Sequence, residues 1–344
     1  MTRAKQAILR GPRDLHIEDI DIDIYNLAPH EIWVKTEISA LKIGTDRGNY
    51  EGAGYGLNET DYPRPVGDSS VGTIQGVGSA VTRFKVGDRV ADRHPHSSAH
   101  IFDERQHIVK VPEGVNPEDA VWSHLYTLSG FCYRKAQFEP GEHVAVVGLG
   151  VLGLGAVALG SLFGARVVGL ANSPIRMEMA MKMGAHAAYL SNDPDLHKKL
   201  DDFTNGVGID LVILTANPWP AYRTSVQIVR NGGRVSIVSL LGRGEKPLDF
   251  NPLVLDWFYN KGISLIAVNS EPTGYLFPSN RDEPERFSWN NSCDHIISLM
   301  ADGKLEPKNL VTHRLHYSEI NKAYEMAVSR QKTMLGVIFD WRDA

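Results

Sequence analysis

Three glycines in the stretch HVAVVGLGVLGLGAV have the spacing that binds a pyrophosphate group. Gly148, Gly150 and Gly153 follow an apolar run and stand where a helix would begin. The first glycine permits a tight turn, the second lets the backbone approach a phosphate, and the third lets the helix close onto the strand. The first helical N–H groups, at Val151 and Leu152, would face the phosphates, so we expect a dinucleotide site. Glycines that serve packing alone would be the alternative.

The next strand ends without the carboxylate that usually binds the adenosine ribose of NAD. An Asp or Glu at this place accepts hydrogen bonds from the ribose hydroxyls and repels a 2′-phosphate. Here ARVVGLA runs into Asn172 and Ser173, and Arg176 follows one turn into the next helix. We therefore predict NADP(H) as the cofactor, held by these three residues. Ser173 also has an interpretation as a helix N-cap before Pro174, and Arg176 as a solvated helix residue.

The elements that position this loop alternate along the middle of the chain. Short apolar strands, among them HVAVVG, ARVVGLA, IDLVILTA, RVSIVSL and GISLIAV, are separated by helix-length segments. Apolar strands without polar alternation are typical of a parallel sheet with helices on both faces. We predict a doubly wound, Rossmann-like cofactor domain over residues 126–270.

The two ends of the chain have a different pattern. Residues 1–125 contain short β-like runs such as EIWVKTEIS, SVGTIQGVGSAV, GDRVA and HIVKV, followed by the helical segment EDAVWSHLYTLSGFCYRKA. Runs separated by Gly, Pro and Asp are typical of an irregular, mostly antiparallel β domain. Residues 271–344 resemble the end of this first domain, so we predict an α/β protein of two domains whose chain returns to the first.

Composition excludes several classes of protein for this chain of 344 residues. The net charge of −5 comes without a basic run, which argues against nucleic-acid and membrane partners. Two cysteines, Cys132 and Cys293, exclude a disulfide framework and a multi-thiolate zinc site. No window approaches the roughly 18 apolar residues of a membrane span, and the N-terminus has no signal-peptide h-region. We expect a cytoplasmic protein that acts on a small molecule.

The combined pattern resembles the medium-chain dehydrogenase/reductase superfamily, the zinc alcohol dehydrogenase-like group, over essentially the whole chain. The similar pieces are GTDRGNY, PRPVGDSSVGTIQGVGSAVTRFKVGDRV, FEPGEHVAVVGLGVLG, a Met-rich helix ending in KMGA, and LVTHRLHYSEINKAYEMAVSRQKTMLGVIFDW. The resemblance implies a GroES-like, mostly β catalytic domain together with the Rossmann domain. It also implies a homodimer or homotetramer that pairs through the last Rossmann strand, GISLIAV in this chain.

The sequence departs from the family pattern at the zinc-ligand positions. Zinc-dependent members have Cys, His and either Cys or Glu at positions that are Ile43, Asp68 and about Leu128 here. Ile and Leu cannot bind a metal, and one Asp is not a zinc site. The four-Cys lobe that holds a structural zinc in many relatives is missing as well. The shorter connection ADRHPHSSAH is loosely similar to the subgroup that includes the bacteriochlorophyllide hydroxyethyl dehydrogenases, and we expect a zinc-independent enzyme.

Without zinc, another group must stabilise the substrate oxygen, and the resemblance implies three residues. Thr45 stands where relatives place a hydroxyl that relays the substrate proton. Asp68 occupies the ligand position, and His94 falls where relatives have a substrate-pocket residue. We predict these three as the catalytic residues, with the histidine titrating near neutral pH.

Each of these residues also has a simpler interpretation. Thr45 would only cap a helix that begins near Asp46, Asp68 would only bind backbone N–H groups, and the histidines would form an exposed loop. Lys42 and Tyr126 are the reserve candidates for the proton donor.

Three functions fit this sequence. The first is a zinc-independent, NADP(H)-dependent oxidoreductase that interconverts a secondary alcohol and a ketone by hydride transfer. The second is an NADPH-dependent reductase of activated C=C bonds, of the enoyl or quinone type, and the third is a nucleotide-binding protein without catalysis. Residues 50–62 and 271–291 are expected to shape the substrate pocket.

Overall fold

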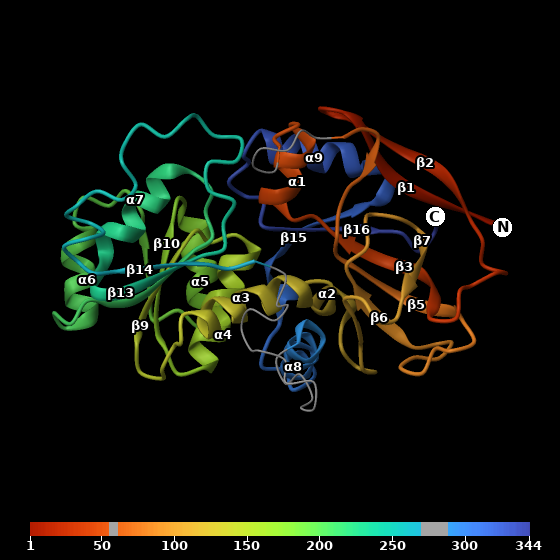
Figure 1. The fold of residues 1–344 in the computed structure, drawn as a ribbon, viewed down its shortest axis with the longest axis horizontal. Helices are drawn as coiled ribbons and strands as arrows, with labels where there is room; N and C mark the ends of the chain where they lie inside the picture. The colour runs from red at the N-terminus through yellow and green to blue at the C-terminus, as the bar shows by residue number, and fades with distance from the viewer. Residues whose placement is uncertain (55–60, 270–287) are drawn as a thin grey trace. The chain divides into compact units, whose positions relative to one another are not determined.

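The structure is a computed structural model that describes residues 1–54, 61–269 and 288–344. The two segments expected to shape the substrate pocket therefore lie partly outside the described residues. The chain forms two compact units (Figure 1), one from Met1–His124 with Phe277–Ala344 and the other from Leu125–Leu276. Across the described residues, no helix has the length and apolar character to span a bilayer.

The second unit is built on a parallel sheet (Figure 1). Its six described strands lie in the order β11-β10-β9-β12-β13-β14, and every pair is parallel. Strand order that runs outward in both directions from the first strand is the doubly wound Rossmann arrangement, so the predicted α/β fold class is confirmed. The strands are β9 His143–Val147, β10 Arg166–Ala171, β11 Ala187–Leu190, β12 Ile209–Leu214, β13 Val229–Ile237 and β14 Ser264–Ala267. The helices are α3 Ser123–Lys135, whose first two residues belong to the first unit, α4 Val151–Leu162, α5 Pro174–Lys182, α6 Leu196–Thr204 and α7 Trp219–Ile228.

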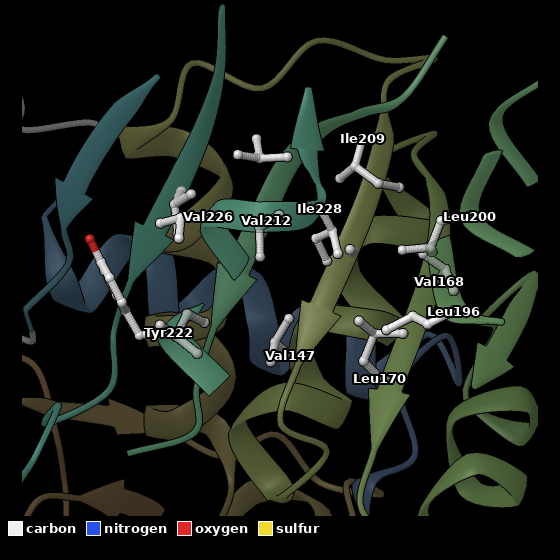
Figure 2. Packing of buried hydrophobic residues seen from close by; sticks show 14 of the residues in the cluster. Val147, Val168, Leu170, Leu196, Leu200, Ile209, Val212, Tyr222, Val226 and Ile228 are labelled. Carbon is white, nitrogen blue, oxygen red and sulfur yellow. The ribbon is translucent and has the colours of Figure 1, made fainter. Parts of the chain in front are cut away.

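Burial explains why the central strands of this sheet are mainly apolar. All six residues of β12 are buried, because helices cover the sheet. Figure 2 shows one layer of this core, where Val212 of β12 lies near Val226 of α7 and Val168 of β10 lies near Leu200 of α6. This packing holds the carboxyl ends of β9 and β10, and with them the glycine loop, in place.

The first unit is mostly β, as the resemblance to a GroES-like domain implies. Its larger sheet has the order β15-β16-β3-β5-β6-β8, with β7 also paired to β3, and a smaller sheet has the order β2-β1-β4. The strands are β1 Thr2–Gly11, β2 Asp14–Ile22, β3 Glu31–Ala40, β4 Arg64–Pro65, β5 Ser70–Val77, β6 Arg89–Asp92, β7 Ala99–Asp103, β8 Ile108–Lys110, β15 Val311–His316 and β16 Gly336–Asp340. The helices are α1 Ile43–Tyr50, α2 Pro117–Ala120, α8 Trp289–Ala301 and α9 Ile320–Val328, with 3-10 turns η1 Pro307–Leu310 and η2 Tyr317–Glu319. Since β16 pairs with β3, the end of the described chain completes a sheet begun near its start.

The helical segment predicted after the β-rich region is two helices, α2 and α3, rather than one. Asn116 caps α2 by accepting a hydrogen bond from the Glu118 N–H at 2.9 Å. The Trp122 N–H then bonds to the carbonyl of Asp119, three residues back, which tightens the turn. The Trp122 side chain is fully buried, so its packing sets where the chain turns.

Candidate active site

The glycine loop has the geometry that its spacing predicts. Gly148 has φ +99°, and a Cβ on it would lie 2.8 Å from the Ala216 nitrogen. A Cβ on Gly153 would lie 1.9 Å from the Gly148 carbonyl oxygen, so only glycine lets α4 approach β9 this closely. Thr215 donates a hydrogen bond from Oγ1 to that same carbonyl at 2.6 Å and holds the turn.

Gly150, the second glycine of the loop, leaves the backbone at the start of α4 open to a ligand. Gly150 is the N-cap of α4, and the nearest atom to a Cβ built on it is Arg176 Nη1 at 4.0 Å. No acidic side chain lies in the first turn of α4, where Val151 and Leu152 begin the helix. The first N–H groups of a helix have no intrahelical partner and carry the positive end of the helix dipole. This end of α4 therefore suits a pyrophosphate group.

The end of β10 carries a buried hydroxyl. Ser173 is the N-cap of α5 with Pro174 behind it, but its side chain makes no capping hydrogen bond. Its Oγ is buried and has no hydrogen-bond partner within the described part of the chain. Asn172, the neighbouring residue, is exposed. A polar ligand at this point would satisfy the hydroxyl.

Arg176 folds back over the glycine loop. Its Nη1 donates a hydrogen bond to the Leu149 carbonyl at 2.6 Å, and burial lowers the pKa of the guanidinium. The interpretation of Arg176 as a solvated helix residue is therefore wrong. Its guanidinium ties the helix after β10 to the loop after β9, the two places where a dinucleotide would lie.

In the first unit, α1 begins three residues earlier than the capping interpretation of Thr45 requires. The helix starts at Ile43, with Lys42 as its N-cap, and the Lys42 N–H donates to the Asp46 carboxylate at 2.7 Å. Thr45 therefore lies in the first turn of α1, partly exposed, and does not cap the helix. The buried Asp46 closes the helix N-terminus, which is a structural role.

Asp68 lies at the centre of a charged group that we call the Asp68 cluster: Lys42, Asp68, Arg93 and His124. Lys42 Nζ forms an ion pair with Asp68 Oδ1. On Oδ2, Arg93 Nη2 lies at 3.3 Å and His124 Nε2 at 3.9 Å. The side chains are 11% exposed for Lys42, 24% for Asp68, 21% for Arg93 and 5% for His124, so the cluster is accessible but largely desolvated. Because Asp68 forms ion pairs with these side chains, the interpretation that it only binds backbone N–H groups is wrong.

The charges around Asp68 decide its protonation state. Burial on its own would raise the pKa of this carboxyl, but the cations of Lys42 and Arg93 outweigh burial and hold the pKa well below its usual range. Burial also keeps the pKa of His124 well below the ordinary histidine value. The cluster at neutral pH therefore consists of a carboxylate, an ammonium, a guanidinium and a neutral imidazole.

Local packing explains how Asp68 comes to face these groups. The preceding residue, Gly67, has φ +91°, and a Cβ on it would lie within 2.7 Å of the His96 ring. Only glycine fits between Val66 and Asp68 with that ring in place. On the other side, the His124 ring centroid lies 5.6 Å from that of Trp289, at the start of α8.

His94 does not join the Asp68 cluster. Its Nδ1 lies 3.0 Å from the Pro95 carbonyl oxygen and 3.2 Å from Ser97 Oγ, and its ring stacks on His100 at 3.9 Å between centroids. His100 in turn binds the buried carboxylate of Asp92 at 2.9 Å. Burial lowers the pKa of His94 to about 3.

Two expectations about His94 and its neighbouring histidines are therefore wrong. His94 does not titrate near neutral pH, because its surroundings exclude the charged form. The neighbouring histidines are not an exposed loop either, since His96 and His100 are buried.

Sequence reasoning missed His124 and Arg93, and it placed Lys42 only in reserve. The third zinc position had been aligned to about Leu128, but the residue that the structure brings to Asp68 is His124, four positions earlier. Nothing local marks these residues, because each reaches Asp68 from a separate segment. Tyr126 belongs to the second unit and is fully buried.

The residues present do not fit a zinc ion. Within the described ranges, no three or more His, Cys, Asp or Glu side chains are arranged to hold a metal. Ile43 supplies no ligand atom, and the Lys42 ammonium occupies one oxygen of Asp68, the carboxylate at the aligned ligand position.

A Rossmann sheet with a pyrophosphate-type loop, together with a GroES-like β unit, defines a class of oxidoreductases, and the comparisons place the chain within it. Residues 28–162 match the alcohol dehydrogenase GroES-like domain, and residues 151–274 match the zinc-binding dehydrogenase model. Together these matches span more than half of the chain, which belongs to the medium-chain dehydrogenase/reductase superfamily.

Individual relatives are distant. The chain is 25% identical to the sorbitol dehydrogenase of Bacillus subtilis (strain 168), over 97% of this chain and 96% of the relative. It is 27% identical to the NADP-dependent isopropanol dehydrogenase of Thermoanaerobacter brockii, over 78% and 82% of the two chains. Among solved structures, the quinone oxidoreductase of Pseudomonas syringae pv. Tomato DC3000 has a TM-score of 0.76 and 23% identity, over 98% and 99% of the two chains.

Proposed function

We propose that this protein is a zinc-independent, NADP(H)-dependent oxidoreductase that interconverts a secondary alcohol and a ketone by hydride transfer. The observation that carries the proposal is the Asp68 cluster, in which an ammonium pairs with the carboxylate at a zinc-ligand position. A carbonyl that accepts hydride develops negative charge on its oxygen, and a desolvated cation is the kind of group that stabilises this charge.

The second unit supports NADP(H) as the cofactor. Its open glycine loop suits the pyrophosphate, and the buried Ser173 hydroxyl together with Arg176 suits a 2′-phosphate at an end of β10 that has no carboxylate. When bound, the cofactor supplies the hydride. The relative from Thermoanaerobacter brockii is NADP-dependent by its name, which agrees with this choice.

In the first unit, the proposal keeps Thr45 and Asp68 and drops His94 from the chemistry. Thr45 lies partly exposed in the first turn of α1, three residues after Lys42, and its hydroxyl is suited to bind the substrate oxygen. Asp68 remains ionised and holds the cations of its cluster in place.

Zinc independence has a direct test. Protein purified without added metal should contain far less than one zinc per chain and should keep its turnover in a chelator, because Ile43 and the Lys42 ion pair leave no ligand set. Elemental analysis and assays with and without chelator measure both. Stoichiometric zinc, with turnover lost in chelator and restored by zinc, would contradict the proposal.

Reduction of an activated C=C bond is the second candidate, favoured by the similarity to a quinone oxidoreductase. That reaction also needs a donor for an oxygen, namely the oxygen of the enolate. A panel separates the two functions: isopropanol, sorbitol and butanediol with NADP⁺, acetone and acetoin with NADPH, and then cyclohexenone and a naphthoquinone with NADPH. Turnover confined to the last two compounds would reassign the reaction.

A further inference from the structure

We propose that Lys42 is the catalytic acid of this enzyme, and that its ammonium donates both a hydrogen bond and a proton to the substrate oxygen. This inference rests on the proposed ketone chemistry and adds the residue that performs the step. The role is the one that zinc performs in metal-dependent relatives, carried out here by a charge that belongs to the chain.

Both the backbone and the side chain of Lys42 are held by carboxylates. Its backbone N–H is held by Asp46 at the start of α1, and its Nζ is held by Asp68. An ammonium has three N–H donors, and an ion pair with one carboxylate oxygen uses one of them. The Lys42 side chain is 11% exposed, so the ammonium is largely desolvated yet not sealed away from a ligand.

The other members of the Asp68 cluster cannot be the acid. Asp68 is ionised and has no proton to give. Arg93 does not release a proton in proteins, so it can donate hydrogen bonds only. His124 is buried in its neutral form beside Trp289, and His94 lies in a different network. Asp68 and Arg93 are therefore positioning residues for the lysine.

The step balances as follows. When the carbonyl carbon receives the hydride, the electron pair of the C=O π bond moves to oxygen. A proton leaves Lys42 Nζ for this oxygen, the N–H bonding pair stays on nitrogen, and the resulting amine takes a proton from water. In alcohol oxidation the neutral amine accepts the hydroxyl proton instead.

The test compares three variants with the wild type, using acetone and acetoin as probes. Lys42→Met should lower turnover by ~10²- to 10⁴-fold, the usual effect of removing a general acid. NADPH affinity, measured by fluorescence titration, should stay within a few-fold of the wild type. Lys35→Met removes an exposed lysine of the neighbouring strand β3 and should change neither quantity.

The double variant Lys42→Met with Asp68→Asn separates proton donation from charge balance. If Lys42 only neutralises Asp68, removing both charges restores turnover to within a few-fold of the wild type, which overturns the inference. If the ammonium is the acid, the double variant stays as slow as Lys42→Met. Thermal melting of each variant shows whether it is folded, and the double variant keeps the test decisive if the single variant unfolds.

Chemical rescue adds a readout that a purely structural role would not change. In Lys42→Cys, alkylation of the introduced thiol with 2-bromoethylamine rebuilds a side chain of lysine length, while the native Cys132 and Cys293 are fully buried. Turnover should return, and the alkaline limb of the pH profile for ketone reduction should move to lower pH, because the thioether makes the amine more acidic. Return of turnover without that move would overturn Lys42 as the proton source.

The failures of the two proposals are distinguishable. If the wild type reduces ketones and Lys42→Met does so equally well, only the Lys42 inference is wrong. A wild type that reduces only C=C bonds, or whose ketone reduction needs zinc, contradicts the proposed function and the inference together.

Discussion

Arg176 is the residue on which cofactor choice can be tested. Arg176→Ala should weaken NADPH binding by about 1 to 3 kcal/mol, the scale of a charge-assisted hydrogen bond, and should weaken NADH binding less. Fluorescence titrations with both cofactors measure the difference. Lys182→Ala, in the last turn of the same helix, is the matched control. Equal weakening of both cofactors would show that the guanidinium supports the loop through Leu149 rather than the 2′-phosphate.

His94 gives a prediction about stability rather than activity. Its pKa is lowered to about 3 in the folded protein, against about 6.5 in an unfolded chain. Between these values the unfolded state binds more protons, so the free energy of unfolding falls as the pH falls from about 6.5, by up to about 1.4 kcal/mol per pH unit for this residue.

His94→Gln should therefore lose less stability than the wild type between pH 7 and roughly pH 5. Denaturant melts across that range measure the slopes, with the exposed His295→Gln as the control. Parallel slopes for the wild type and His94→Gln would show that the histidine is solvated in the folded state. Turnover in the variant should stay close to that of the wild type, because His94 lies outside the Asp68 cluster.

At the scale of elements, Lys261 stabilises the end of α7. This helix passes directly into β13 at Val229, and the Lys261 ammonium donates hydrogen bonds to the carbonyls of Val226, Gln227 and Val229 at 3.0, 2.7 and 2.7 Å. A cation at a helix C-terminus satisfies carbonyls that have no intrahelical partner.

Lys261→Met should reduce the free energy of unfolding by about 1 to 3 kcal/mol, since it leaves these carbonyls without a charged donor. Chemical denaturation measures the change, and Lys246→Met, at an exposed loop position, is the control. A loss no larger than that of the control would mean that water replaces the ammonium at no cost.

Elements differed in how far the sequence predicted them. The glycine loop is local, because Gly148, Gly150 and Gly153 lie within six positions and their steric needs follow from a strand and a helix that touch. The buried strands could also be predicted from the sequence, since apolar runs without polar alternation are typical of a sheet covered on both faces. The turn between α2 and α3 could not be predicted from the sequence, because it depends on the burial of Trp122.

The Asp68 cluster was beyond sequence reasoning for a related reason. Its members come from the start of α1, the stretch before β5, the end of β6 and the start of α3, so no spacing along the chain relates them. The resemblance supplied Asp68, because that position carries a ligand in metal-dependent relatives. It also suggested His94, whose stacking on His100 only the fold reveals.

At the scale of the whole molecule, we expect a homodimer or homotetramer. β14 is an edge strand of the described Rossmann sheet, and an apolar edge left bare would invite aggregation. Light scattering at micromolar concentration should therefore give a mass of at least two chains of 38.0 kDa each. A single-chain mass across that range would contradict this expectation.

The pairing of β16 with β3 sets an order of events during synthesis on the ribosome. Residues 125–276 are continuous and can fold as soon as they emerge, because domains fold as units during translation. The first unit has to wait, since β5 and β7 pair with β3 early but residues 38–40 of β3 gain β16 only after residues 336–340 have been made. During that interval residues 38–40 of β3 lack their partner strand β16, and the pocket that will receive Trp341, which donates a hydrogen bond to Ser39, stays open. The nascent chain therefore needs chaperone protection at this part of β3 until residues 336–341 have been made and have packed against it.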